Sequence, residues 1–342
     1  MTFWNTTSTN SAAPSMTHVL RLIQPPYTYL RIKPAEHPET SYIIRRASSA
    51  DAESIQLFWN KYYRGDDWYF QAPVSFVAGY VNDLTTIVLL LFDGDALCGT
   101  IVSAPLNQPI TWSAAERRPP AVLRIIEGLV VATAYRGKGI AGHLIAAADA
   151  YTSTVTPCAH LWARELPTAP WFHTAMHIAK YAYISCSAAK TQTYKIQTMS
   201  WAPFSAHWAR LSAGMPAHWL RVGLPEIPPP GLDIWVSSSD PSLMAAVVKT
   251  NRYSADTNQE LWEVQYVSNP EAPSLFPFLE SVAARYTGCL FVTDSPAVCG
   301  EKLRGIAPPW YYGRSGVHAW YIYNYIPPMF GSTVLYSLRP EL

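Results

Sequence analysis

The sequence predicts a mixed fold of the α+β kind, arranged in two lobes, and three observations support this. Segments with strand patterns and segments with helix patterns alternate along most of the chain. The length of 342 residues suggests two domains, since one domain takes roughly 150 residues. A stretch rich in proline, residues 216–231, interrupts the alternation and is the expected connection between the lobes.

These observations divide the chain into four parts. Residues 1–40 are polar, contain proline and lack periodicity, so we expect an arm that packs over the rest. Residues 41–215 form the expected first lobe, residues 216–231 the connection and residues 232–342 the second lobe. The second lobe echoes the strand and helix alternation of the first but has no glycine-rich loop, as a degenerate repeat would.

Periodicity assigns the individual elements. In the first lobe it predicts strands at 42–46, 85–92, 97–104, 125–131 and 159–164 and helices at 51–63, after residue 139, and at 171–183. In the second lobe it predicts strands at 232–236, 289–293, 317–325 and 333–338 and helices at 241–251 and 276–286. Asp93-Gly94-Asp95 predicts a hairpin between two first-lobe strands, because Asp-Gly supports the positive φ values of tight turns.

Composition excludes several classes of protein. The net charge is +1 and only 14% of residues are charged, whereas a nucleic-acid surface needs clustered Lys and Arg. The longest apolar run, Ile87–Phe92, is far shorter than the ~20 residues that cross a bilayer. The five cysteines form no CxxC pair, so neither a disulfide framework nor a metal site is indicated. We therefore expect a soluble, cytoplasmic protein with no nucleic-acid partner, no stable membrane insertion and no metal.

A glycine-rich turn connects the predicted strand at 125–131 to a predicted helix. It reads Arg136-Gly137-Lys138-Gly139-Ile140-Ala141. The first N–H groups of a helix lack partners within the helix, and glycines let an anion approach them, so the turn is suited to a phosphate. The spacing matches neither the dinucleotide fingerprint nor the nucleoside-triphosphate loop.

This turn resembles the pyrophosphate loop of the GCN5-related N-acetyltransferase (GNAT) superfamily, which holds the diphosphate of an acyl-coenzyme A. The resemblance implies an acyl-CoA co-substrate and no permanently bound cofactor. It also implies a central strand that diverges from its neighbour so that the thioester can enter. The residues expected to bind the cofactor are then Val130, Val131, Arg136, Gly137, Lys138, Gly139, Ile140 and Ala141.

Other segments are similar to eukaryotic-type glycylpeptide N-myristoyltransferases, which are two fused acetyltransferase-like lobes. The similar segments are Phe3-Trp4-Asn5-Thr6, Asn60-x-x-Tyr63-x-x-Asp66-Asp67-x-x-Phe70, Trp171-Phe172-His173, and Glu301-Lys302-Leu303 followed by Trp320-Tyr321-Ile322-Tyr323-Asn324-Tyr325. In that family the first segment covers the coenzyme A, and the second borders the peptide groove. The glycine turn departs from that family's version and resembles the general acetyltransferase loop instead.

The resemblance implies two tandem acetyltransferase-like lobes, each a mixed and mostly antiparallel sheet flanked by helices, in a monomeric enzyme. The implied reaction moves a long acyl chain from myristoyl-CoA, or another acyl-CoA, to the N-terminal glycine amine of a protein by direct attack. Phe3 and Trp4 would cover the cofactor, and Tyr63, Asp66, Asp67, Phe70 and His173 would bind the acceptor. Two alternatives stay open: an acetyl-CoA-dependent N-acetyltransferase acting on a lysine or small amine, and a non-catalytic protein that binds acyl-CoA and peptide.

The implied chemistry needs an oxyanion hole and a base. By the resemblance, the backbone amides of Gly128 and Leu129 form the oxyanion hole. The family assigns the base to its own C-terminal carboxylate, which here belongs to Leu342. Glu127 competes, because it lies where many acetyltransferases place a base glutamate, and burial near the thioester would raise its pKa. We prefer Glu127 and keep both candidates.

Overall fold

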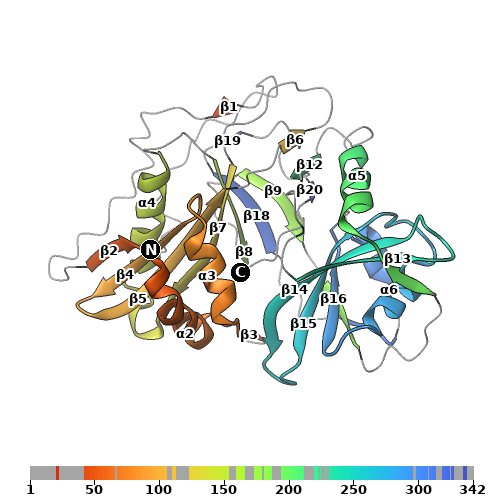
Figure 1. The fold of residues 1–342 in the computed structure, drawn as a ribbon, viewed down its shortest axis with the longest axis horizontal. Coiled ribbons are helices and arrows are strands. Elements are labelled where there is room, and N and C mark those ends of the chain that lie inside the picture. Colours follow the sequence, from red (N-terminus) through yellow and green to blue (C-terminus); the bar gives the residue numbers. More distant parts are fainter. Residues whose placement is uncertain are drawn as a thin grey trace.

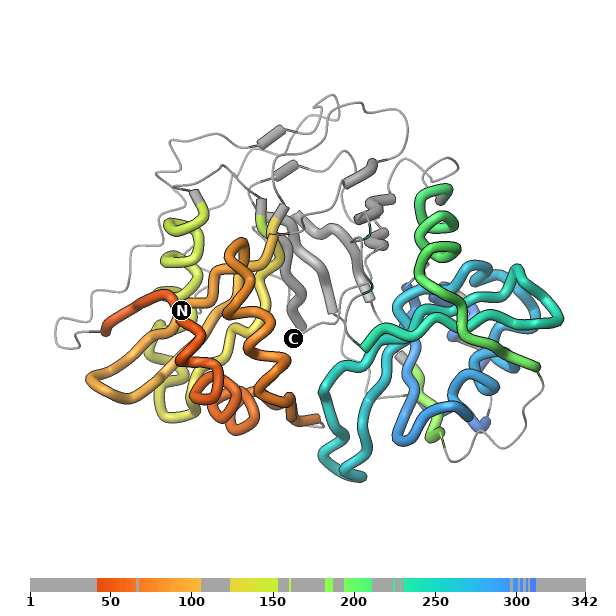
Figure 2. Tube along the Cα trace, viewed as in Figure 1, coloured from red at the N-terminus to blue at the C-terminus, as the bar shows by residue number. Residues whose placement is uncertain are grey.

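The fold consists of two lobes that lie side by side (Figure 1). The computed structural model describes residues 21–22, 42–65, 68–105, 110–112, 123–153, 159–165, 173–178, 181–186, 194–211, 219–222, 224, 228, 231–295, 298–306, 308–312, 318–323, 325–326 and 334–336. In the tube view residues 42–62 and 71–105 lie in one lobe and residues 231–295 in the other (Figure 2).

The first lobe is built on a seven-stranded sheet. Its order is β2 (Tyr42–Arg46), β4 (Ile87–Asp93), β5 (Ala96–Pro105), β7 (Leu123–Val131), β8 (Ala159–Glu165), β18 (His318–Tyr323) and β9 (His173–Ile178). Neighbouring strands run antiparallel except β7 and β8, which are parallel. Gly94, with φ 57°, forms the predicted hairpin turn between β4 and β5.

Helices cover both faces of this sheet. Helices α2 (Ala52–Tyr62) and α3 (Val74–Asn82) bury Ile55, Phe58, Trp59 and Val77 against one face. Helix α4 (Ile140–Ser153) buries Ile140, Leu144 and Ala148 against the other. Strands β4 and β5 contribute apolar residues to both cores, as their long apolar runs require of strands buried on both faces.

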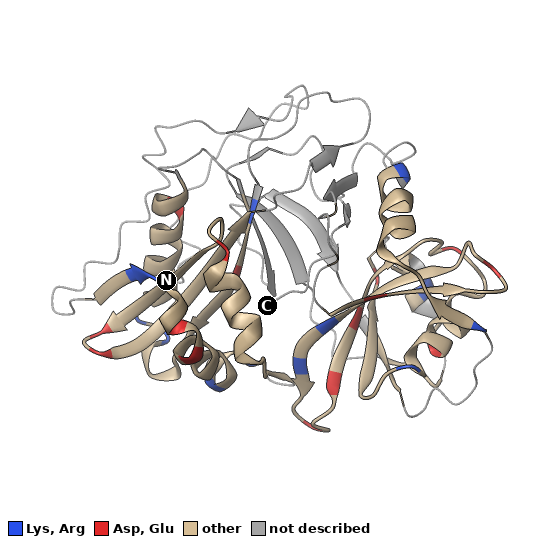
Figure 3. Cartoon of the chain, viewed as in Figure 1, with Lys and Arg blue, Asp and Glu red and all other residues tan. Residues whose placement is uncertain are grey.

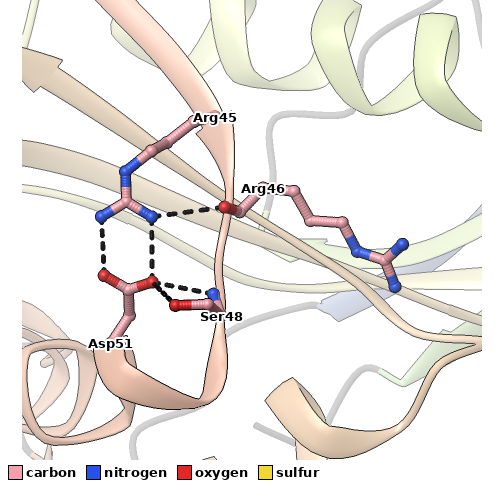
Figure 4. Close-up of polar contacts among 4 residues, drawn as sticks. All are labelled: Arg45, Arg46, Ser48 and Asp51. Atoms are coloured by element: carbon pink, nitrogen blue, oxygen red, sulfur yellow. Dashed lines mark hydrogen bonds and ion pairs between the residues drawn. The ribbon is translucent and has the colours of Figure 1, made fainter.

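An ion pair secures the start of α2, after the short helix η1 (Ser49–Asp51) (Figure 4). The Arg45 guanidinium donates from Nη1 to Asp51 Oδ2 at 2.9 Å and from Nη2 to Asp51 Oδ1 at 2.6 Å. The Ser48 backbone N–H also donates to Asp51 Oδ2, at 2.8 Å. The hydrogen bonds from Arg45 hold the pKa of Asp51 well below its ordinary value.

The second lobe contains an eight-stranded sheet. Its order is β11 (Ile196–Thr198), β13 (Leu232–Ser237), β14 (Met244–Ser254), β15 (Glu260–Val267), β16 (Cys289–Thr293), β10 (Tyr181–Ser185) and β17 (Tyr311–Tyr312), with β3 (Trp68–Phe70) pairing with β14. Helix α6 (Leu275–Ala283) packs on one face through Phe278 and Val282. Helix α5 (Trp201–Leu211) packs through Phe204 and Trp208 against Ile234, Ala246 and Tyr266.

Smaller elements complete the described fold. Strands β1 (Arg21–Leu22) and β19 (Tyr325–Ile326) pair with each other, and β20 (Val334–Tyr336), β12 (Trp219–Val222) and β6 (Ile110–Trp112) form a three-stranded sheet. Two short helices are η2 (Thr133–Tyr135) and η3 (Gly300–Gly305). Described elements of both lobes carry Lys and Arg interspersed with Asp and Glu (Figure 3).

Two predicted helices are wrong. Residues 171–183 were expected to be helical, but the described part forms strand β9 and the beginning of β10. Residues 241–251 were also expected to be helical, but Met244–Ser254 is strand β14. Residues 244–248 of β14 are buried, and a continuous apolar run does not distinguish a buried strand from a buried helix by periodicity. Helices α3 and α5 and strand β15 are further elements that the sequence pattern did not predict.

Each large sheet takes strands from both sides of the proline-rich connection at 216–231. Strand β18 follows that connection in the chain, yet it lies between β8 and β9 in the first sheet. Strands β3, β10 and β11 precede the connection and belong to the second sheet. The domain boundaries at 215 and 232 stay a prediction of where the backbone passes from one lobe to the other. Each large sheet contains strands from both sides of that connection.

Candidate active site

The first sheet opens between β7 and β8. These strands pair only from Leu123 to Ile125 on β7 and from Ala159 to Leu161 on β8. Beyond Ile125, β7 continues to pair with β5 on its other side, up to Val131. The remainder of β7, which includes Glu127, Gly128 and Leu129, therefore borders an opening in the ladder, as expected for a strand that admits a thioester.

A β-bulge interrupts β7 at this opening. Val102 on β5 pairs with Glu127 and Thr100 pairs with Val130, so Gly128 and Leu129 together oppose the single residue Ile101. Gly128 has φ 53°, a left-handed conformation that glycine adopts far more readily than other residues. The bulge thus accounts for the glycine in an otherwise apolar strand.

The bulge also reverses the alternation of side chains along β7. Ile125 packs in the core with α2 and α3, and Ile126 packs in the core with α4. Beyond the bulge it is Val130 that faces α2 and α3, while Leu129 and Val131 face α4. A regular strand would have placed Leu129 on the same face as Ile125.

Glu127 lies immediately before the bulge and is 8% exposed. The Tyr80 hydroxyl of α3 donates to Glu127 Oε2 at 3.4 Å. Tyr80 in turn packs edge-on against Trp59 of α2, with ring centroids 6.3 Å apart. The carboxylate is therefore a buried acidic group next to the bulge, and an aromatic residue that the sequence analysis did not single out contacts it.

The glycine turn at 136–139 lies between η2 and the first turn of α4. Gly137 and Gly139 have φ 79° and φ 80°, and residues 136–139 are exposed. The turn therefore presents backbone N–H groups at the start of a 14-residue helix, the arrangement that binds phosphate. Ile140 is buried beneath it, whereas Ala141 is half-buried.

The two basic side chains of the turn contact the protein itself. Arg136 donates from Nε to the Val131 carbonyl at 3.2 Å and from Nη2 to the Tyr62 carbonyl at 3.3 Å. It thereby ties the turn to the ends of β7 and α2. Lys138 Nζ lies 4.9 Å from the centroid of the Tyr135 ring, a cation–π contact. Arg136 thus has a structural role that its sequence motif did not predict.

The predicted acceptor-binding residues are only partly described. Tyr63 is half-buried, and Phe70 is completely buried, with their ring centroids 5.3 Å apart. Phe70 is therefore a core residue in this structure. His173 begins strand β9 rather than a helix. Phe3, Trp4, Asp66, Asp67 and Leu342 lie outside the described residues.

Three buried or half-buried side chains near the bulge were missed. Trp59 and Thr100 are fully buried, and the Trp59 indole N–H donates to Thr100 Oγ1 at 2.8 Å. The Thr100 hydroxyl donates to the Gly128 carbonyl at 3.0 Å. Tyr80 contacts Glu127, as described above. A polar Thr within the apolar run of β5 was the signal available in the sequence.

Other kinds of site are not indicated in the described residues. There, no group of three or more His, Cys, Asp or Glu side chains is placed to hold a metal ion. No helix in the portions of the chain that the structure describes is long and apolar enough to cross a membrane.

Comparisons with known proteins agree with this geometry. Residues 50–169 match the Acetyltransferase (GNAT) family. No curated protein matches the sequence significantly. The fold is similar to N-myristoyltransferase of Saccharomyces cerevisiae with bound myristoyl-CoA, with TM-score 0.62 and 12% identity, over 96% of this chain and 94% of that chain. A second structure of that enzyme, with myristoyl-CoA and inhibitors, gives TM-score 0.61 and 12% identity over 96% and 91%.

The family match places the bulge, Glu127 and the glycine turn inside one recognised domain. The likeness to the yeast enzyme concerns the fold and extends to both lobes. The chain therefore contains a GNAT acyltransferase domain within a two-lobed α+β fold, and this domain implies acyl-CoA as its co-substrate.

Proposed function

We propose that the protein transfers a long acyl chain, such as that of myristoyl-CoA, to the N-terminal glycine amine of a peptide or protein. The observation that carries this proposal is the extent of the structural likeness. A GNAT domain accounts for residues 50–169, whereas the likeness to yeast N-myristoyltransferase covers 96% of this chain and includes the second lobe. A second lobe offers the additional surface that a peptide acceptor needs.

The proposed reaction is direct acyl transfer. The amine lone pair attacks the thioester carbonyl, the carbonyl oxygen becomes an oxyanion, and collapse of the intermediate forms the amide and expels the coenzyme A thiolate. The Gly128 and Leu129 backbone amides are the proposed donors to the oxyanion. Fixed amide dipoles of this kind stabilise the negative charge without reorganising during the reaction.

Glu127 is the proposed base. An α-ammonium group with a pKa near 8 is mostly protonated at pH 7, and only the free amine attacks. Its burial immediately beside the bulge supports this assignment, because a carboxylate next to the proposed oxyanion donors can accept the proton that the amine loses. The carboxylate of Leu342 is the alternative base, as the resemblance to the myristoyltransferases implies.

Binding of the co-substrate is assigned to the glycine turn and the adjoining strand. The N–H groups of Gly137, Gly139, Ile140 and Ala141 are the proposed ligands of the pyrophosphate. The Lys138 N–H donates to the Tyr135 carbonyl at 3.4 Å, and the Lys138 side chain supplies a positive charge on the same turn. Val130 and Val131 follow the bulge and are the proposed contacts of the pantetheine. Phe3 and Trp4 are proposed to cover the coenzyme A, and Tyr63, Asp66, Asp67 and His173 to border the acceptor, whereas Phe70 packs in the core beneath Tyr63.

A second candidate is transfer of a short acyl group. The observations that favour it are the acetyltransferase family match and the Arg-Gly-x-Gly form of the turn. The acceptor would then be a lysine or another small amine. The two candidates differ in donor length and in acceptor, so one assay separates them.

The test incubates the full chain with myristoyl-CoA or acetyl-CoA and a peptide that starts with glycine, and reads product mass. We expect a myristoylated peptide, and no product from the same peptide with its amine acetylated. A product with acetyl-CoA but none with myristoyl-CoA would overturn the proposal in favour of the second candidate.

The base is tested by the same assay on E127Q, which should show kcat lowered by about 10²–10⁴-fold, the usual contribution of a general base. Full activity in E127Q, with loss after residues are added beyond Leu342, would assign the base to the C-terminal carboxylate.

A further inference from the structure

We propose that Thr100, held by Trp59, is a positioning residue that aims and polarises the Leu129 N–H as an oxyanion donor. This inference rests on the proposed acyl transfer and names residues outside the glycine turn and the bulge. It starts from the hydrogen bonds on the β5 side of the bulge, which are buried and connect α2, β5 and β7.

The chemistry of the three groups fixes the direction of these hydrogen bonds. An indole N–H only donates, so the Thr100 oxygen must accept from Trp59 at 2.8 Å. The single hydroxyl proton of Thr100 is then available to the Gly128 carbonyl at 3.0 Å. Trp59, Thr100 and Gly128 are all buried, so water does not compete for these groups. The chain of donation runs one way, from Trp59 through Thr100 to Gly128.

The planar peptide unit relates this hydrogen bond to the direction of the Leu129 N–H. The Gly128 carbonyl and the Leu129 N–H belong to one planar peptide group, and among described residues a cis peptide occurs only at Pro308-Pro309. In a trans peptide the carbonyl and the N–H point in opposite directions. Since the Thr100 hydroxyl holds the carbonyl, the Leu129 N–H points away from that hydroxyl. The ladder between β7 and β8 has already ended at Ile125, so pairing with β8 does not take up this N–H.

The same contacts strengthen the donor. A carbonyl that accepts a hydrogen bond withdraws electron density from its own peptide nitrogen, and hydrogen bonds in a chain polarise one another at low dielectric. The donation from Trp59 makes the Thr100 proton more acidic and adds to this effect. Gly128 supplies the φ of 53° that turns the peptide, and Thr100 holds the peptide in that orientation.

The test compares T100V, which removes the hydroxyl but keeps the shape, with T100S, which keeps the hydroxyl. Loss of a complete oxyanion donor costs about 10²–10³-fold in kcat. For a misaligned donor we expect T100V to lower kcat by about 10–100-fold with little change in the KM for acyl-CoA, and T100S to restore most of it. The matched control is T250V, because Thr250 is also buried and its hydroxyl also donates to a carbonyl, that of Leu261 at 2.6 Å, in the other lobe.

A second readout depends on binding alone. The infrared stretch of a ¹³C-labelled thioester carbonyl, in bound acyl-CoA, reports how strongly the protein polarises it. We expect a lower frequency with the wild type and T100S than with T100V, and no change in T250V. If T100V and T250V reduce kcat equally, or if the frequency is the same in all four proteins, the positioning role is overturned. A wild type that polarises the thioester but forms no myristoylated peptide would overturn the proposed function and leave the positioning role supported.

Discussion

At the scale of single residues, burial governs the charge of two neighbouring groups in the first lobe. His160 on β8 and Asp149 on α4 lie close, with 3.9 Å between Nδ1 and Oδ1. An ion pair would raise the pKa of the histidine and lower that of the carboxyl. Burial instead lowers the pKa of His160 to about 3, with a further contribution from the charge of Arg124, and burial raises the pKa of Asp149 to about 6. Desolvation thus outweighs attraction between the two groups.

The two shifts have opposite effects on stability. The pKa of His160 falls from 6.5 on folding, so the unfolded chain takes up the proton first and stability is lost as pH falls below about 6.5. The pKa of Asp149 rises from 3.8 on folding, so the folded chain takes up the proton first and stability increases as pH falls through about 6. Between pH 7 and 5 the two effects largely cancel.

Removal of Asp149 should expose the histidine effect. We expect the unfolding free energy of D149N to fall by about 2 kcal/mol between pH 7 and 5, and that of the wild type by less than about 1 kcal/mol. These values follow from the pKa shifts, since one pKa unit corresponds to about 1.36 kcal/mol. The measurement is denaturant unfolding at both pH values. D51N is the matched control, because the pKa of Asp51 is lowered and its contribution is lost only below the ordinary value of 3.8. Equal pH dependence in D149N and the wild type would contradict the prediction.

At the scale of elements, one glycine sets the distance between α4 and the sheet. A Cβ atom on Gly99 of β5 would lie 2.8 Å from Leu144 Cδ1 and 2.9 Å from Ile140 Cγ2, and both of these residues belong to α4. The start of α4 carries the glycine turn. Close packing at Gly99 therefore positions the proposed pyrophosphate ligands.

Replacement of this glycine should weaken co-substrate binding. In G99A the Ile140 and Leu144 side chains, and with them the start of α4, are pushed away from β5, so we expect an affinity for acyl-CoA lower by about 10-fold and a stability loss of about 1–3 kcal/mol, as for other overpacked cores. Calorimetric titration with acyl-CoA measures the first quantity. G79A is the control, because a Cβ on Gly79 of α3 would meet nothing within 4 Å. Unchanged affinity in G99A would refute this role.

Prediction of the elements succeeded where the pattern was local. The helix predicted at 51–63 is α2, the helix at 276–286 is α6, and the strands around Asp93-Gly94-Asp95 are β4 and β5. These segments have clear periodicity or a turn with its own chemistry. Residues 241–251 have an apolar run instead, and their strand conformation depends on pairing with β13 and β15. Pairing partners far along the chain leave no periodic signal in the segment itself.

At the scale of the whole molecule, the lobes are joined by more than the backbone connection. Strand β18 pairs with both β8 and β9, and β3 pairs with β14. At the β3–β14 junction the Tyr69 ring stacks on Tyr253, with centroids 5.6 Å apart, and the Arg252 guanidinium lies 4.7 Å from the Trp68 ring. The Tyr69 hydroxyl also donates to Asn258 Oδ1. We infer that the lobes fold as one unit.

Separation of the lobes should therefore prevent folding. A fragment of residues 1–215 lacks β18, which leaves the edges of β8 and β9 available for aggregation. We expect it to be insoluble alone and to form a stable complex when produced together with residues 216–342, as judged by size-exclusion chromatography. The control is the intact chain cleaved at a protease site placed within 225–227, whose pieces should stay together. A soluble 1–215 fragment with cooperative unfolding would show that the lobes fold independently.

The sequence by itself determined the features that depend on neighbouring residues. The glycine turn before a helix, the Asp-Gly hairpin and the amphipathic α2 all follow from local backbone chemistry and periodicity. Only the tertiary structure decided the bulge at Gly128, the donation from Trp59 through Thr100, and the insertion of β18 between β8 and β9. Thr100 lies 41 residues from Trp59 and 28 from Gly128, and such contacts exist only once distant strands and helices have packed together. The glycine turn and Glu127 are therefore visible in the sequence, whereas the contacts of Trp59, Thr100 and Tyr80 around the bulge are a property of the fold.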